Sequence, residues 1–133
     1  MKNVLILMGS ESDRERMEKA LPILQAASVE TEVHVSSAHR EPDRTADFAK
    51  QAESRGFGVI ICGAGLSAAL PGVVAAHTAL PVIGVPLSAA LGGLDALLST
   101  VQMPPGVPVA CVGIDNATNA AHLALRILRL AGD

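Results

Sequence analysis

The sequence predicts an α/β protein in which helices cover both faces of a parallel sheet, a three-layer α/β/α sandwich. Five short runs rich in Val and Ile are nearly continuous in apolar character, which is typical of strands buried on both faces. Helical patterns separate these runs in strict alternation. Because crossovers between parallel strands are right-handed, this alternation restricts the topology to the flavodoxin-like or Rossmann-like group. The expected strands are Asn3–Met8, Glu30–Val35, Gly58–Cys62, Pro81–Val85 and Pro108–Val112.

The helical segments carry recognisable start and stop signals. Ser10 or Ser12 can cap the first helix, and Asp13 lies at its positive end. Pro22 lies inside this helix and should kink it or end it early. Pro42 suits the first turn of the second helix, where its missing N–H costs nothing. The expected helices are Asp13–Ala27, Pro42–Arg55, Ala68–Thr78, Leu94–Val101 and Ala117–Leu130.

Length and charge distribution indicate one domain that associates with copies of itself. The 133 residues fit a single domain over residues 1–133 that can bury a core. Only 17% of the residues are charged, against roughly 25% in an average soluble protein. Asp95 is the sole charge between Gly56 and Ile114. Since so uncharged a surface is hard to keep solvated, we expect part of it to be a contact in a homo-oligomer.

Composition also argues against several classes of protein. Prolines and glycines interrupt the apolar second half before any segment reaches the roughly 20 residues that span a membrane. The N-terminus leads straight into a strand without a signal-peptide pattern. Cys62 and Cys111 lie in apolar runs, which favours buried thiols in a reducing, cytoplasmic compartment over a disulfide or metal site. A net charge of −3 with no Trp or Tyr argues against nucleic-acid binding.

The loop after the first strand has the residue types of a phosphate site. Loops that follow parallel strands lie together at the carboxyl edge of the sheet, where ligands bind. Ser10 and Ser12 supply hydroxyls there, Asp13 supplies a carboxylate, and a helix N-terminus supplies free N–H groups. The loop lacks both the Walker lysine and the glycine pattern of dinucleotide-binding proteins. The alternative is that these three residues only cap the helix.

The loop after the second strand carries His39 and Arg40. A guanidinium at a strand end can hold a phosphate or carboxylate through two hydrogen bonds, and an imidazole can move a proton near neutral pH. The alternative is a half-buried histidine bonded to a backbone carbonyl, beside a surface arginine. The position at the carboxyl edge favours function. Together the two loops predict a site for a phosphorylated small molecule with an acid/base group beside it.

The third loop, residues 63–72, consists almost wholly of small, uncharged residues. Such residues let backbone N–H groups approach a ligand and keep a pocket dry. The alternative is a tight strand-to-helix turn packed at an interface. His77 and His122 lie in apolar helical stretches, so we interpret them as core or interface residues. Asp95 is interpreted as a helix cap or as a partner for another subunit.

Six short motifs, in order and at matching spacing, resemble the PurE family of purine biosynthesis, the carboxyaminoimidazole ribonucleotide mutases. The resemblance implies a flavodoxin-like fold and a homo-octamer with active sites at subunit contacts. It implies a ribonucleotide and CO2 as small-molecule partners, and no metal or organic cofactor. The motifs are Met8-Gly9-Ser10-Glu11-Ser12-Asp13, Ser37-Ala38-His39-Arg40, Gly63-Ala64-Gly65, Leu70-Pro71-Gly72, Pro81-Val82-Ile83-Gly84-Val85-Pro86 and Val101-Gln102-Met103-Pro104.

The resemblance also implies roles for individual residues. The family reaction moves a carboxylate from the exocyclic nitrogen of an aminoimidazole ribonucleotide to ring carbon C4. His39 is implied as the general acid/base, because the C4 proton must leave after the carboxylate is captured. The residues implied to bind the ribonucleotide are Ser10, Ser12, Asp13, Ser37, Arg40, Gly65 and Ser67.

One position departs from the mutase pattern. Mutase-type members usually carry a histidine at the place of Ala69, whereas members that carboxylate aminoimidazole ribonucleotide directly with CO2 have residues like Ser67 and Ala69. Those members usually carry lysine where this chain has Arg40, so overall similarity favours the mutase. CO2-dependent carboxylation remains the first alternative. A non-catalytic module for phosphorylated ligands, and a carboxylating relative from nickel-cofactor biosynthesis, are the others.

Overall fold

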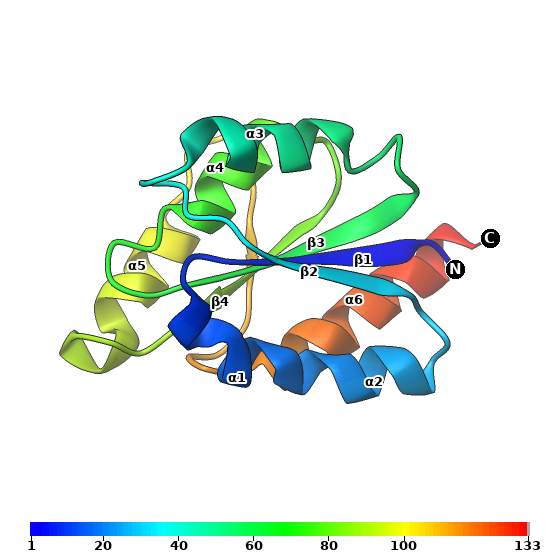
Figure 1. The fold of residues 1–133 in the computed structure, drawn as a ribbon, viewed down its shortest axis with the longest axis horizontal. Helices are drawn as coiled ribbons and strands as arrows, with labels where there is room; N and C mark the ends of the chain where they lie inside the picture. Colours follow the sequence, from blue (N-terminus) through cyan, green and yellow to red (C-terminus); the bar gives the residue numbers. More distant parts are fainter. Residues whose placement is uncertain (133) are drawn as a thin grey trace.

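The computed structural model describes residues 1–132 and has a five-stranded sheet between two layers of helices (Figure 1). All neighbouring strands pair in parallel, in the order β2-β1-β3-β4-β5. This order is flavodoxin-like, so it confirms the predicted fold class and decides between the two topologies that the alternation allowed. The strands are β1 (Asn3–Met8), β2 (Thr31–Val35), β3 (Phe57–Ala64), β4 (Val82–Pro86) and β5 (Ala110–Cys111).

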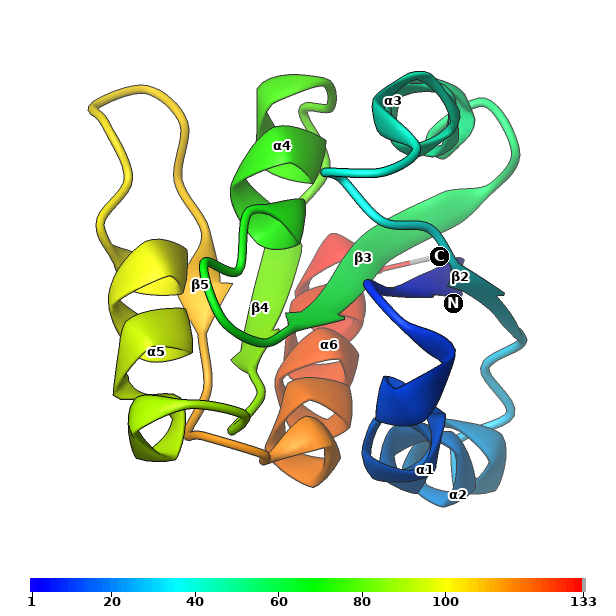
Figure 2. The same ribbon diagram turned by 60° about the vertical axis from the view of Figure 1, so that its left-hand side comes forward.

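Helices form the two outer layers. The helices α1, α2 and α6 cover one face of the sheet, and α3, α4 and α5 cover the other (Figures 1 and 2). No helix within residues 1–132 is long and apolar enough to cross a membrane. The α-helices are α1 (Arg14–Met17), α2 (Leu21–Ala26), α3 (Pro42–Gln51), α4 (Leu70–Ala76), α5 (Leu94–Val101) and α6 (Ala117–Ala131); the 3₁₀ turns are η1 (Glu11–Asp13), η2 (Glu18–Ala20) and η3 (Leu91–Gly93).

Two apolar cores lie on the two faces of the sheet. Successive side chains of a strand point to opposite faces, so Ile6 joins the core under α6 and Leu7 joins the core under α3 and α4. Both side chains are fully buried. The continuous apolar run of β1 is therefore explained by burial on both sides, as predicted. At the edge of the sheet, β2 is only half-buried along its whole length.

The first predicted helix is wrong as one continuous element. The segment after β1 divides into η1, α1, η2 and α2, with Pro22 in the first turn of α2. A proline is tolerated there because its N–H would have no intrahelical partner, so the expected interruption is confirmed. Ser10 caps η1 by accepting the N–H of Ser12 at 3.3 Å. Asp13 therefore ends a 3₁₀ turn instead of opening a long helix.

Other boundaries differ at loop junctions. Helix α3 ends at Gln51 because the chain then turns into β3 through Gly56, whose φ of +90° is left-handed. Strand β5 has two residues rather than the five predicted, since Pro108 cannot donate to the sheet and pairing reaches only Ile83 and Gly84 of β4. Helix α5 has the predicted bounds.

Candidate active site

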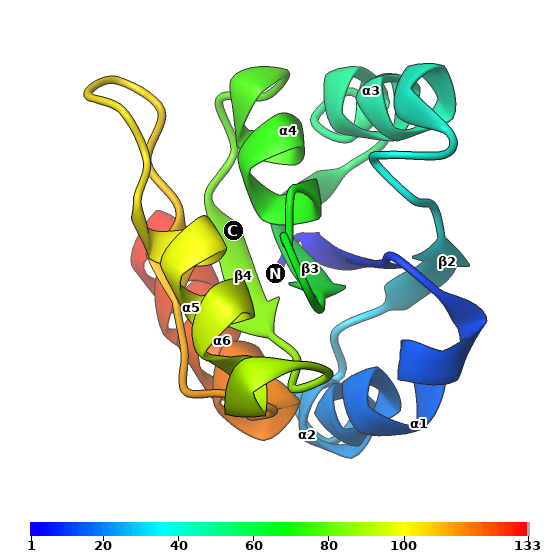
Figure 3. The ribbon, with the colours of Figure 1, turned by 90° about the vertical axis from the view of Figure 1, so that its left-hand side faces the viewer.

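A cavity of about 280 Å³ opens at the carboxyl edge of the sheet. Figure 3 looks onto this edge, where the loops after β1, β2, β3 and β4 converge. The chain places β2 on one side of β1 and then adds β3, β4 and β5 on the other side. Open α/β sheets bind ligands at such a switch in strand order, here between β1 and β3. The three loops that the sequence singled out do meet here, together with Ala89 from the loop after β4. The lining residues are Gly9, Ser10, Ser12, Asp13, Ser37, Ala38, His39, Arg40, Ala64, Gly65, Leu66, Ala68, Ala69, Leu70 and Ala89.

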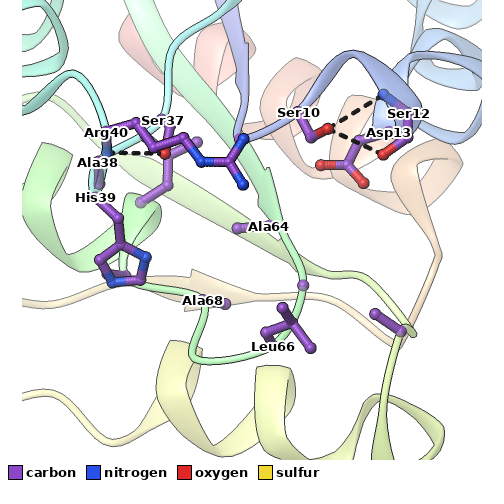
Figure 4. Close-up of a pocket in the computed structure, with 15 residues that line it drawn as sticks. Ser10, Ser12, Asp13, Ser37, Ala38, His39, Arg40, Ala64, Leu66 and Ala68 are labelled. Atoms are coloured by element: carbon purple, nitrogen blue, oxygen red, sulfur yellow. Dashed lines mark hydrogen bonds between the residues drawn. The ribbon is translucent and has the colours of Figure 1, made fainter.

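One wall consists of the polar residues after β1. The Ser10 and Ser12 hydroxyls lie 3.0 Å apart, and the Asp13 side chain is buried beside them (Figure 4). The capping interpretation is correct for Ser10, but capping leaves the Asp13 carboxylate facing the cavity. Because η1 and α1 are so short, the dipole of a long helix is not present here. Side-chain hydroxyls and the carboxylate are therefore the polar groups that this wall presents to the cavity.

The ionisation of Asp13 is set by two opposed effects. Burial raises the pKa of the Asp13 carboxyl above its ordinary value, against the charge and hydrogen bonding of Arg16, which favour the ionised form. The Arg16 Nη2 donates to Asp13 Oδ1 at 3.0 Å. A carboxylate held in this way can accept hydrogen bonds from the hydroxyl groups of a ligand.

The opposite wall carries His39 and Arg40. The Ser37 hydroxyl accepts the backbone N–H of Arg40 at 3.2 Å, and the Glu41 N–H donates to the Ser37 carbonyl at 2.8 Å. Within residues 1–132, neither the imidazole of His39 nor the guanidinium of Arg40 has a hydrogen-bond or ion-pair partner. The alternative of a histidine bonded to a backbone carbonyl therefore does not describe this structure. Figure 4 shows the guanidinium reaching across the cavity toward Ser10 and Asp13.

The loop after β3 forms the third, uncharged wall. A Cβ added at Gly65 would lie 3.2 Å from the carbonyl of Leu87 and 3.4 Å from Ala89, so glycine lets the loops after β3 and β4 pack closely. Leu66 has a left-handed backbone with φ of +55°, which is uncommon for a residue with a side chain. Its side chain is 57% exposed and lines the cavity.

The structure does not bring every expected residue to the cavity. Ser67 is exposed and does not line it, because the loop turns at Leu66 and directs the cavity-facing positions to Ala68 and Ala69. Ala69 leaves open the space where the mutase pattern places a histidine. Leu66 belongs to the third loop that the sequence singled out, whereas sequence reasoning missed Ala89. The position of Ala89 after a strand that ends at this edge was the available signal.

The arrangement suits acid/base chemistry on a polar ligand. The Arg40 guanidinium reaches across the cavity toward two hydroxyls and a carboxylate, and the His39 imidazole stands on the same side as Arg40, near the uncharged wall. Among residues 1–132, no group of three His, Cys, Asp or Glu side chains lies close enough to hold a metal ion. Cys62 is fully buried, and burial raises the pKa of its thiol, so it is not an available nucleophile.

Comparison with known proteins gives consistent matches. A family model described as AIR carboxylase matches residues 3–133. The chain is 58% identical to the N5-carboxyaminoimidazole ribonucleotide mutase of Pyrococcus abyssi, over 98% of this chain and 75% of that protein. It is 56% identical to the Schizosaccharomyces pombe phosphoribosylaminoimidazole carboxylase, over 92% of this chain and 22% of that protein. A crystal structure of Treponema denticola PurE superposes with a TM-score of 0.85 at 34% identity, over 96% of this chain and 80% of that one.

Proposed function

The chain belongs to the AIR carboxylase family, and from this premise we propose that it interconverts N5-carboxyaminoimidazole ribonucleotide and 4-carboxy-5-aminoimidazole ribonucleotide in purine biosynthesis. The observation that carries the proposal is the His39 imidazole, which has no partner within residues 1–132 and lines a cavity with one polar wall and one uncharged wall. The relatives that this chain covers over most of their length are named as mutases, which supports the mutase over the carboxylase.

Each wall of the cavity has a part in holding the ribonucleotide. Arg40 binds the phosphate through its guanidinium, which has no competing partner within residues 1–132. Ser10, Ser12 and Asp13 bind the remaining phosphate oxygens and the ribose hydroxyls. The other residues of the proposed substrate site are Ser37 and Gly65, whereas Ser67 is left out because its side chain is exposed.

His39 gives a proton to the exocyclic nitrogen of the substrate and takes one from ring carbon C4. When the carbamate C–N bond breaks, CO2 is released and the bonding electrons return to the exocyclic nitrogen, which takes a proton from His39. The electron-rich C4 then attacks the CO2 and forms the new C–C bond. Neutral His39 removes the proton from C4, which restores the aromatic ring and returns the imidazole to its starting state. One residue of tunable protonation therefore serves both half-reactions.

The uncharged wall keeps the CO2 in place between these steps. This wall includes Ala68, Ala69 and Leu70, which offer no polar side chain to hydrogen-bond water, so the wall is poorly hydrated. Backbone N–H groups of its small residues can face the carboxylate. A second candidate function is direct carboxylation of aminoimidazole ribonucleotide with CO2. Ala69 supports it, because the space beside this wall could admit CO2 from solution.

We further propose that the protein is a homo-oligomer, an octamer by the family resemblance, with sites at subunit contacts. Leu91, Leu94, Leu98 and Val101 repeat at helical spacing along η3 and α5, and their side chains are 43–77% exposed. An apolar stripe of this kind is covered in most soluble proteins, and a second copy is the partner that the uncharged second half predicts. The free thiols of Cys62 and Cys111 support a cytoplasmic location.

The test supplies N5-carboxyaminoimidazole ribonucleotide to the purified protein without ATP and follows formation of the C4-carboxylated product. We expect enzyme-dependent conversion. Conversion of aminoimidazole ribonucleotide plus bicarbonate, with none from the carbamate, would favour the carboxylase. Binding of ribonucleotide without conversion of either substrate would leave only the binding module.

A further inference from the structure

Arg16 connects the cavity wall to a residue far away in the sequence. Its Nη2 donates to Asp13 Oδ1 at 3.0 Å, and its Nη1 donates to Asp115 Oδ1 at 3.0 Å. Asp115 follows β5, 99 positions after Arg16, and does not line the cavity. One guanidinium therefore bridges a carboxylate that faces the substrate site and a carboxylate behind it.

Asp115 also holds the loop after β4. Its Oδ1 accepts the backbone N–H of Ser88 at 2.9 Å, and its Oδ2 accepts the Ser88 hydroxyl at 2.5 Å. Arg16 Nη1 additionally donates to the Ser88 carbonyl at 2.9 Å. Ser88 precedes Ala89, which lines the cavity. The cluster thus joins α1, the loop after β4 and the loop after β5.

The backbone of Asp115 indicates that this arrangement is tightly held. Its φ of +61° is left-handed, a conformation that residues other than glycine rarely adopt, although aspartate and asparagine tolerate it best. In this conformation its N–H donates to the Pro86 carbonyl at 2.8 Å, at the end of β4. The main chain of Asp115 therefore bonds to the end of β4, and its side chain bonds to the loop that follows β4.

We propose that Arg16 and Asp115 are positioning residues, which hold the Asp13 carboxylate in the orientation that binds the ribose hydroxyls and couple the loops after β4 and β5 to the substrate site. This inference rests on the proposed function, because it takes a ribonucleotide as the ligand of Asp13. Neither residue touches the substrate. Both act through Asp13 and through Ala89, which stands next to the clamped Ser88.

The charges around Asp13 predict how the pair acts. Arg16 faces Asp13 from α1, Asp115 stands behind Arg16, and Arg40 reaches toward Asp13 from the opposite loop. Burial raises the pKa of Asp13 and Arg16 opposes this effect, so removing Arg16 should raise the pKa of Asp13 further. The hydrogen bonds from Ser88 and the charge of Arg16 outweigh burial at Asp115 and lower its pKa, so Asp115 stays ionised beside Arg16.

The experiment compares Arg16→Met, Arg16→Lys and Asp115→Asn with a matched control, Arg14→Met. Arg14 lies two positions before Arg16 in α1 and pairs with Glu11 at the surface, outside the cluster. The first readout is the titration of the Asp13 carboxyl carbon, followed by NMR without ligand. The second is the pH dependence of kcat and KM for N5-carboxyaminoimidazole ribonucleotide.

For Arg16→Met we expect the Asp13 titration to move to higher pH and KM to rise about tenfold, the usual scale for a lost charge-assisted contact, while kcat stays within about twofold. Because protonated Asp13 binds hydroxyls poorly, the acidic limb of kcat/KM should move to higher pH in the same variant. Arg16→Lys should restore part of both shifts, and Asp115→Asn should show smaller shifts in the same direction.

An unchanged Asp13 titration in folded Arg16→Met, or equal effects in Arg14→Met, would overturn the inference. A fall in thermal stability with no change in KM or in the titration would also overturn it, since that result describes a merely structural role. If Arg16→Met does not fold, Arg16→Lys and Asp115→Asn decide by the same readouts. Failure of the unmodified protein to convert the carbamate would refute the proposed function instead, and the Asp13 titration would still test the positioning.

Discussion

The hydroxyls of Ser36 and Thr45 lie 2.7 Å apart, and both side chains are fully buried. Ser36 directly follows β2 and Thr45 lies in α3, so this hydrogen bond joins the two ends of the loop that carries His39 and Arg40. The loop is thereby held at both ends, while the His39 and Arg40 side chains have no partner within residues 1–132. An exposed loop at the cavity is thus anchored by a contact in the interior.

Removing either hydroxyl alone should destabilise the protein. Ser36→Ala or Thr45→Val leaves one buried hydroxyl without a partner, which costs about 1–3 kcal/mol. The double variant should lose less than the sum of the two single losses, since neither polar group then remains. Urea denaturation, at one protein concentration, measures the free energy of unfolding of the unmodified protein, the two single variants and the double variant. Strictly additive losses would show that the two hydroxyls do not depend on each other.

Much of the fold could be predicted because local pattern and tertiary environment agree. The run from Asn3 to Met8 is apolar at every core position, and the strand has the predicted bounds. The prediction of one continuous first helix was wrong because the apolar spacing continues through Pro22. Met17 and Leu24 still face the core although the helix is broken between them. Such breaks depend on packing rather than on the pattern of apolar residues.

The sequence could predict which loops meet at the cavity, but not which of their side chains face it or pair with one another. Topology alone brings the loops after β1, β2 and β3 together, and this needs only the order of elements. Which side chain of the third loop faces the cavity depends on the left-handed backbone at Leu66, and no local signal marks it. The link from Arg16 to Asp115 spans 99 positions, and neither residue stands out in its own segment.

Close packing at Gly84 provides a second stability prediction. A Cβ added there would lie 2.3 Å from Thr100 Cγ2 and also near Val109 and Pro71. Gly84→Ala should therefore overpack this region and lower the free energy of unfolding by about 1–3 kcal/mol. Gly113→Ala is the matched control, because a Cβ added at Gly113 would meet only Asn116 Cβ, at 3.8 Å, which is an ordinary contact distance. Equal stabilities of the two variants would contradict the packing described for β4 and α5.

His39→Asn tests the proton-transfer residue. Asparagine keeps a similar shape but cannot accept the C4 proton, so turnover should fall by at least about a hundredfold, the usual scale for loss of a general acid/base. Because the imidazole has no partner within residues 1–132, the variant should fold normally. Calorimetry with aminoimidazole ribonucleotide should still detect binding. Near-normal turnover in the folded variant would remove His39 from the mechanism.

Light scattering at micromolar concentration should return a mass several times the 13.6 kDa of one chain. Leu98→Glu places a charge in the apolar stripe of α5 and should reduce that mass. The control is Leu130→Glu, because Leu130 is 89% exposed on α6 and lies outside the stripe. A monomeric mass for the unmodified protein would refute the assembly.

The last prediction separates the two sources of the carboxylate. A mutase must recapture the CO2 released from its own carbamate before that CO2 escapes, whereas a carboxylase admits CO2 from solution. Both mechanisms use His39 and Arg40, so variants of these residues cannot distinguish them. An isotope experiment distinguishes them: the reaction is run on the unlabelled carbamate in the presence of labelled bicarbonate. We expect unlabelled product at early times.

Ala69 is the residue on which this outcome depends, since it leaves open the cavity wall where mutase-type sequences usually carry histidine. Extensive early labelling, or efficient turnover of aminoimidazole ribonucleotide with dissolved CO2, would assign the protein to the carboxylases. Ala69→His fills that space, so the variant should retain still more of the released CO2 and admit less label. The comparison needs a bicarbonate concentration at which the unmodified protein incorporates a measurable trace. If labelling is the same in both proteins, the alanine is a neutral replacement, and retention depends on the rest of the loop.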